Sequence, residues 1–199
     1  MAFPGLWGFM VWDVLHWMAE VLYVSPSLLA HWKKVVMSIV LTLPCPACKY
    51  HATIYVTTHK LSRVEHAKDA RVYTLQLHNA VNRRINKSAW SLSMYLSKYQ
   101  RIRNRSARLS AESMCLYLLL VAQSLPPTKD LHVDLKATLR AGWTSMLSIY
   151  KHVYPIHSSS LSAQIPYNRD TLTEYVVSLR RELGLKHHSR SRLEDEFRR

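Results

Sequence analysis

The stretch WGFMVWDVLHWMAEVL, residues 7–22, opens the part of the chain that decides the fold. Its apolar side chains recur at spacings of three and four, which places them on one face of an α-helix. They are Trp7, Met10, Val11, Val14, Leu15, Met18 and Leu22. The pattern predicts a buried helix over residues 7–23. Residues 1–18 have no basic start and no small-residue cleavage site, and they are short and interrupted by Asp13 and His16, so we expect neither a signal peptide nor membrane insertion.

The residues that follow continue the helical pattern. Ser25-Pro26 predicts a second helix, with Ser25 as its cap and Pro26 at its first position, running to about Leu43. Cys45-Pro46 predicts the start of a third helix, and residues 59–68 read as a polar connection. Further helices are expected near residues 69–86, 90–100, 110–124, 130–153 and 169–184. We therefore predict an all-α protein, with a helical bundle in residues 1–100 and a C-terminal helical extension with a basic tail in residues 101–199.

The composition restricts the class of protein without naming its partner. The chain has 199 residues, 4 glycines and a net charge of +14. Such a charge attracts nucleic acid, acidic proteins and anionic lipid without choosing among them. One local run of arginines, Arg101, Arg103, Arg105 and Arg108, is typical of a solvated linker or helix face. With 3 cysteines, the chain does not resemble a disulfide-stapled secreted scaffold.

Cys45 and Cys48 are the first candidates for chemistry. The free N–H groups and the positive dipole end at a helix start favour a thiolate, and Pro46 stiffens the turn between the two cysteines. The pair also has a structural interpretation, because Cys45 and Cys48 with His51 and a remote His78 could hold zinc. Their setting between long apolar helices favours redox chemistry. The third cysteine, Cys115, lies in an apolar run and is expected to be a buried core thiol.

Two further helical segments combine aromatic and polar side chains. Trp12 and His16 are four residues apart and share one helix face, as do His78 and Asn82, with Asn79 beside them. Buried His and Asn side chains need partners. Taken singly, His16 and His78 are most simply core histidines. Taken together with the cysteine pair, the set would suit a planar heteroaromatic cofactor.

These residues resemble the Erv/ALR flavin-linked sulfhydryl oxidases. Three motifs occur in the order of that family: Gly8-x-x-x-Trp12-x-x-x-His16, Cys45-Pro46-Ala47-Cys48, and His78-Asn79-Ala80-Val81-Asn82 continuing to Lys87. The resemblance spans about residues 5–95. It implies an FAD-binding helical bundle, with Cys48 next to the flavin and Cys45 exchanging with substrate. It also implies that Gly8, Trp12, His16, His78, Asn79, Asn82 and Lys87 lie in the cofactor site, and Tyr23 and Tyr73 stand where members often carry aromatic residues.

The chain also departs from the family pattern. Phe9 replaces a common arginine, so a phosphate or adenosine contact is expected from Arg83, Arg84 or Lys87 instead. A second, shuttle cysteine pair is absent, because Cys115 has no neighbouring cysteine. Compact members without a shuttle pair are typical of large DNA viruses, which suggests a viral origin. With no targeting signal visible, such a protein is expected in the host cytoplasm or nucleus and in the virion.

The resemblance implies an enzyme that forms disulfide bonds in protein dithiols and reduces oxygen to hydrogen peroxide, and it implies a homodimer. One alternative stays open. The arginine run and the overall charge would also suit a basic, helical nucleic-acid-binding or virion structural protein with a structural zinc site. Nucleic acid is not expected as the main partner if the first interpretation holds.

Overall fold

The computed structural model describes residues 4–99, 107–124, 133–153 and 169–185, and every regular element in these ranges is a helix. The first half contains α1 (Pro4–Val21), the short 3₁₀ turn η1 (Pro26–Leu28), α2 (Leu29–Thr42), α3 (Pro46–Thr58), the turn η2 (Leu61–Arg63), α4 (Ala67–Arg84) and α5 (Leu92–Tyr99). The second half adds α6 (Ala107–Ser124), α7 (Val133–Val153) and α8 (Arg169–Glu182). The predicted all-α class is confirmed, and no described helix is long and apolar enough to cross a bilayer.

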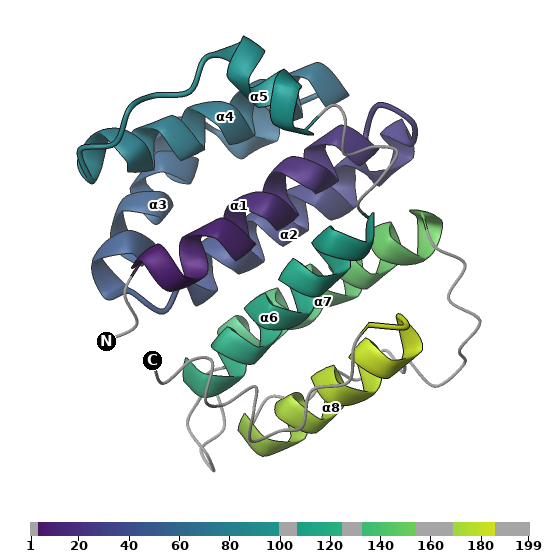
Figure 1. Cartoon of the computed structure of the whole chain (residues 1–199). Coiled ribbons are helices and arrows are strands. Elements are labelled where there is room, and N and C mark those ends of the chain that lie inside the picture. The colour runs from purple at the N-terminus through teal and green to yellow at the C-terminus, as the bar shows by residue number, and fades with distance from the viewer. Residues whose placement is uncertain (1–3, 100–106, 125–132, 154–168, 186–199) are drawn as a thin grey trace.

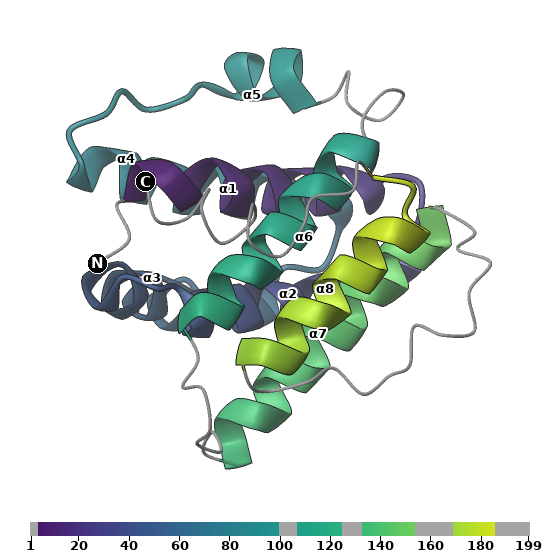
Figure 2. The same cartoon turned by 60° about the horizontal axis from the view of Figure 1, so that its bottom comes forward.

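Helix α1 lies at the centre of the molecule. It packs against α4 on one side and against α6 on the other, while α2 packs along α7 and α8 covers α6 (Figures 1 and 2). The apolar residues of α1 are buried, among them Val14, Leu15 and Met18 at 0–1% exposure. One continuous hydrophobic core therefore joins helices from both halves of the chain.

The start of the second helix differs from the prediction. Pro26 opens η1 rather than an α-helix, and Ser25 makes no capping hydrogen bond with its side chain. The Ser25 hydroxyl instead lies 2.6 Å from Nε2 of His152 on α7. A tertiary partner has thus replaced the local backbone donors that a capping serine would use. The predicted start of the third helix is confirmed, with Cys45 as the cap and Pro46 in the first turn.

The connection between α3 and α4 is less polar than expected. Leu61, the first residue of the turn η2, and Val64, which follows the turn, are buried at 8% and 4% exposure. Beyond it, α4 is held to α1 by a partly buried ion pair in which Arg71 donates to both carboxylate oxygens of Glu20, at 2.6 and 2.7 Å. Tyr95 of α5 donates to the same carboxylate at 3.0 Å. These bonds fix α4 and α5 relative to α1, and so position the side chains discussed below.

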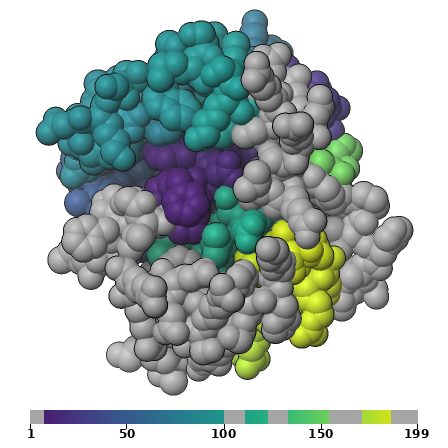
Figure 3. All heavy atoms as spheres, in the orientation of Figure 1, coloured from purple at the N-terminus to yellow at the C-terminus, as the bar shows by residue number. Residues whose placement is uncertain are grey.

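The C-terminal helices approach the bundle closely. Gly142 on α7 lies against Ser38 on α2, so near that a Cβ atom at residue 142 would overlap the Ser38 side chain. Cys115 on α6 is buried at 0% exposure, as predicted, and burial raises the pKa of its thiol to about 12. The space-filling view shows α1 in a hollow between the α4–α5 segment and α6 (Figure 3).

Most of the arginine run lies outside the described residues, as do the side chain of Arg108 and the basic tail beyond residue 185.

Candidate active site

Cys45 and Cys48 form a disulfide at the start of α3. Their Cα atoms are 5.1 Å apart, and Cys45 Sγ accepts a hydrogen bond of 3.2 Å from the backbone N–H of Cys48. The sulfur of Cys45 therefore occupies the place of a helix cap, where the N-terminal N–H groups and the helix dipole stabilise negative charge. Pro46 and Ala47, between the two cysteines, are exposed, so the disulfide lies at the molecular surface.

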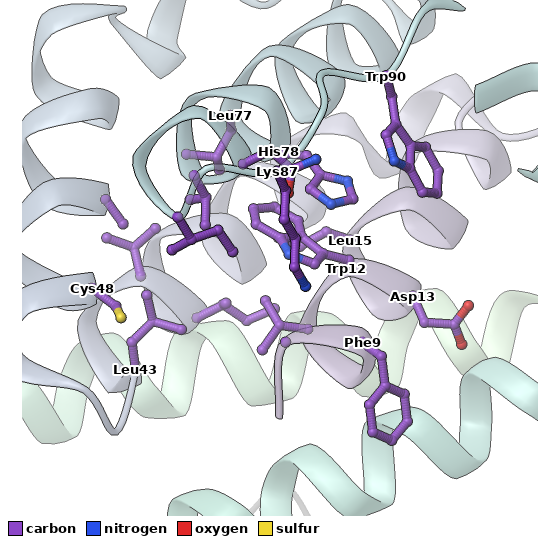
Figure 4. A pocket seen from close by; sticks show the side chains of 18 of the residues that line it. Phe9, Trp12, Asp13, Leu15, Leu43, Cys48, Leu77, His78, Lys87 and Trp90 are labelled. Atoms are coloured by element: carbon purple, nitrogen blue, oxygen red, sulfur yellow. The ribbon is translucent and has the colours of Figure 1, made fainter. Parts of the chain in front are cut away.

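A cavity of about 710 Å³ begins at this disulfide and follows α1. Of the two cysteines only Cys48 lines it, and Figure 4 shows this residue at the edge of the cavity beside Leu43. Its floor is mainly apolar, with residues such as Leu15, Ile39 and Val40 from α1 and α2. A mostly apolar cavity of this size with a few polar groups is the usual form of a site for a cofactor or small ligand.

Aromatic rings of α1 and α4 stack along the cavity. The rings of Trp12 and His78 lie 4.2 Å apart with 12° between their planes, and both residues line the cavity (Figure 4). Behind them, Nε2 of His16 lies 2.9 Å from Nδ1 of His78, within hydrogen-bond distance. Burial lowers the pKa of His78 to about 4 and lowers that of His16 well below its usual value. Both rings are therefore neutral at pH 7, with one nitrogen donating and the other accepting.

The end of α4 brings polar groups to the same cavity. Asn82 lines it and donates from Nδ2 to the carbonyl of Ser88 at 3.2 Å, which ties down the turn after the helix. Lys87 in that turn also lines the cavity. Gly8 on α1 is a cavity residue too, and a Cβ atom there would meet nothing within 4 Å. These three residues, with Trp12, His78 and Cys48, are the predicted site residues that the structure brings together.

Other predicted residues do not line the cavity. Asn79 holds Trp90 in place, because its side chain donates to the Trp90 carbonyl and accepts from the Trp90 N–H, both at 2.8 Å. Tyr23 lies under the Arg71 guanidinium, 4.0 Å from it, and Tyr73 is buried against Trp32 and Tyr55. Arg83 is exposed. Direct contact of these four, or of His16, with a cofactor stays a prediction.

Several cavity residues were not found from the sequence. They are Asp13 on α1, Trp90 before α5, Lys98 and Tyr99 on α5, and Ser113 on α6. The Lys98 ammonium lies 5.0 Å from the centre of the Trp90 ring, a cation–π distance. A signal was available for Asp13, because a carboxylate in a mostly apolar helix needs a partner. Nothing local could have indicated Ser113, since its place depends on how α6 packs.

The zinc alternative required Cys45, Cys48, His51 and His78 to meet. Among the residues that the structure describes, no group of three or more His, Cys, Asp or Glu side chains could hold a metal ion. His51 is exposed and packs its ring against Tyr50, and His78 is engaged with Trp12 and His16. The structure thus does not assemble the ligand set that this alternative proposed.

Comparisons with known proteins match the half of the chain that carries most of this site. The model of the Erv1/Alr family matches residues 9–102. An "FAD-linked sulfhydryl oxidase" of African swine fever virus (isolate Pig/Kenya/KEN-50/1950) is 30% identical over 96 residues, which are 47% of this chain and 80% of that protein. The "Putative FAD-linked sulfhydryl oxidase 096R" of Invertebrate iridescent virus 3 is 32% identical over 100 residues, 49% of this chain and 68% of that protein.

No solved structure matches the chain significantly. Both relatives come from viruses, the source suggested by the lack of a shuttle pair. The match to the family model includes the three motifs of the resemblance except Gly8, which precedes it by one residue, and ends before α6. By its motifs, its helical fold and these relatives, the chain belongs to the Erv1/Alr family.

Proposed function

We propose that this chain is an FAD-dependent thiol oxidase that forms disulfide bonds in protein substrates and reduces oxygen to hydrogen peroxide. The observation that carries the proposal is the position of Cys48, which belongs to a surface disulfide and also lines the same cavity as Trp12 and His78. Such a residue can pass electrons from a dithiol outside the cavity to an acceptor inside it. The names of the viral relatives support this choice of activity.

The cavity residues fit an FAD molecule. Apolar walls and the stacked rings of Trp12 and His78 suit a planar heteroaromatic ring. Lys87 and Lys98 supply two positive charges for a diphosphate, and the open space at Gly8 lets a ligand approach the α1 backbone. We propose that Gly8, Trp12, His78, Asn82 and Lys87 hold the cofactor directly, that His16 orients His78, and that Asn79 acts by holding Trp90.

The first half of the reaction uses only the cysteine pair. A substrate thiolate attacks Cys45 Sγ, so that a bond forms between the substrate and Cys45 while the Cys45–Cys48 bond breaks and Cys48 leaves as a thiolate. The second substrate thiol then gives up its proton and attacks the substrate sulfur of this mixed disulfide, which releases Cys45 as a thiolate. The substrate has lost two electrons and two protons, and the cysteine pair has gained the electrons.

The residues around the pair favour this order of events. The N–H groups at the start of α3 stabilise the thiolate of Cys45 as a leaving group, while Cys48 faces the cavity. When bound, FAD accepts the electron pair from the dithiol and delivers it to oxygen. The neutral His16–His78 pair keeps this region free of a buried charge.

The activity is tested with purified protein and two cysteine variants. Wild-type protein should carry FAD and release hydrogen peroxide when given a reduced protein or a model dithiol. Cys48→Ser should retain FAD and release no peroxide, whereas Cys115→Ala, which changes a thiol buried away from the cavity, should behave as wild type. A colourless wild-type protein with stoichiometric zinc would refute the oxidase and support the structural alternative.

We also propose that the protein forms a homodimer, as the family resemblance implies. In the described structure, faces of α1 and α2 are covered by α6 and α7 of the same chain. A second copy would therefore have to use other surfaces than these. Sedimentation of the purified protein measures its oligomeric state, and a monomer at micromolar concentration would exclude the dimer.

A further inference from the structure

One described residue of the cavity lining comes from the C-terminal half, beyond the part of the chain that matches the family. Ser113 lies on α6, beyond residue 102, and lines the cavity. Its hydroxyl donates a hydrogen bond of 2.8 Å to Oδ2 of Asp13 on α1, which is also a cavity residue. Ser113 is 6% exposed and Asp13 is half-buried, so this bond is partly shielded from water. The C-terminal half of the chain thus reaches into the proposed cofactor site.

Asp13 lies at the opposite end of the cavity from Cys48. Figure 4 shows the two residues on either side of Trp12 and Lys87. Lys98, another cavity residue, interacts electrostatically with Asp13 and lies over the ring of Trp90. This end of the cavity therefore carries a carboxylate, an ammonium group and an aromatic ring. Such a set can bind a nucleotide through its hydroxyl or amino donors, its phosphate and its base.

The Ser113 hydroxyl fixes the carboxylate of Asp13 in this arrangement. Burial raises the pKa of Asp13, so its charged form depends on the groups around it. The hydrogen bond from Ser113 and the charge of Lys98 both favour that charged form. The Ser113 hydroxyl donates its hydrogen bond to Oδ2 of Asp13. The carboxylate can therefore still accept a hydrogen bond from a ligand through its remaining lone pairs.

We propose that Ser113 is a positioning residue of the cofactor cavity, which holds the Asp13 carboxylate at the end distant from Cys48, so that α6 completes the FAD site within one chain. The inference rests on the proposed function. It makes docking of α6 and binding of FAD mutually stabilising, because each favours the same arrangement of Asp13. The C-terminal extension then serves the enzyme by closing its cofactor site.

The test measures the dissociation constant for FAD by titrating apoprotein variants of the full chain and following flavin fluorescence. Ser113→Ala should weaken FAD binding about five-fold, which corresponds to about 1 kcal/mol, the usual scale of one hydrogen bond. Ser113→Thr keeps the hydroxyl and should restore most of the affinity. Ser148→Ala is the matched control, since it removes a serine hydroxyl of α7 that bonds only within its own helix, to the Thr144 carbonyl.

A second pair of variants tests whether Ser113 acts through Asp13. Asp13→Ala should also weaken FAD binding, and adding Ser113→Ala to it should change the dissociation constant by less than about two-fold, because the bond is already lost. If Ser113→Ala does not fold, the test is the dissociation constant of Asp13→Ala for FAD. A value equal to that of wild type then overturns the inference.

The outcomes separate this inference from the proposed function. A wild-type protein that binds no FAD would refute both. A wild-type protein that binds FAD, with Ser113→Ala binding it equally well at lower thermal stability, would refute the inference alone and reduce the Ser113–Asp13 bond to a packing contact. Equal losses of FAD affinity in Ser113→Ala and Ser148→Ala would also overturn the inference. The loss would then follow from any serine substitution in the C-terminal helices and not from the Ser113–Asp13 bond.

Discussion

Gly142→Ala should destabilise the protein by forcing α7 away from α2. A methyl group at residue 142 would overlap Cβ and Oγ of Ser38 and lie 3.3 Å from the carbonyl oxygen of Lys34. Ser38 is 0% exposed, and its Cβ is fixed to the backbone of α2, so no change of rotamer can remove the whole overlap. The two helices must separate, and because Ile39 and Val40 of α2 line the cavity, its floor moves with them.

The magnitude follows from two opposing effects. Overpacking a well-filled contact costs about 1–3 kcal/mol and occasionally more, and an overlap with backbone-fixed atoms belongs at the upper end. Replacing glycine by alanine inside a helix stabilises the folded state by about 1 kcal/mol, because alanine has the higher helix propensity. We therefore expect Gly142→Ala to lower the free energy of unfolding by about 2 kcal/mol, measured by urea denaturation.

A compensating variant shows whether the cause is the proposed contact. Ser38→Gly removes both overlapped atoms, and the Ser38 hydroxyl has no hydrogen-bond partner in the described structure, so its loss leaves no donor unsatisfied. The double variant Gly142→Ala with Ser38→Gly should recover most of the loss, apart from about 1 kcal/mol for the new helix glycine. A single variant as stable as wild type would refute the close docking of the C-terminal helices.

Two further predictions concern the cavity itself. Gly8→Ala meets no atom within 4 Å, so it should stabilise the apoprotein by about 0.5–1 kcal/mol through helix propensity while weakening FAD binding, and unchanged or tighter binding in a fluorescence titration would contradict this. Burial lowers the pKa of His78 to about 4 and also lowers that of His16, so below about pH 6.5 these two side chains bind more protons in the unfolded chain than in the folded chain. The free energy of unfolding should therefore fall by about 1–3 kcal/mol as the pH drops from about 6.5 towards 4, and His78→Gln should flatten this slope in urea titrations at several pH values.

The sequence predicts the local features of this protein well. The three- and four-residue spacing of apolar side chains locates α1 and α2, because burial of one face stabilises each helix. Pro46 after Cys45 predicts the start of α3, since a proline in the first turn loses no intrahelical hydrogen bond. The placement of Trp12 and His78 side by side could be anticipated only through the resemblance, because their contact joins two helices far apart in the chain.

Features that depend on tertiary packing could not be predicted from the sequence. The partner of Ser25 proved to be His152, 127 residues away, in place of the expected local backbone N–H groups. Asp13 and Ser113 are 100 residues apart, and neither shows by itself that the other is its partner. Lys98 enters the cavity because α5 folds back over α1, and that return depends on long-range bonds such as Tyr95 to Glu20.

The most direct test follows the visible flavin absorbance of the purified protein while a dithiol is added in the absence of oxygen. If Cys48 connects the surface disulfide with FAD in the cavity, a first equivalent of dithiol should reduce the Cys45–Cys48 bond and a second should bleach the flavin. Cys48→Ser should keep its colour under the same titration. Bleaching of Cys48→Ser as complete and as fast as that of wild type would contradict the account.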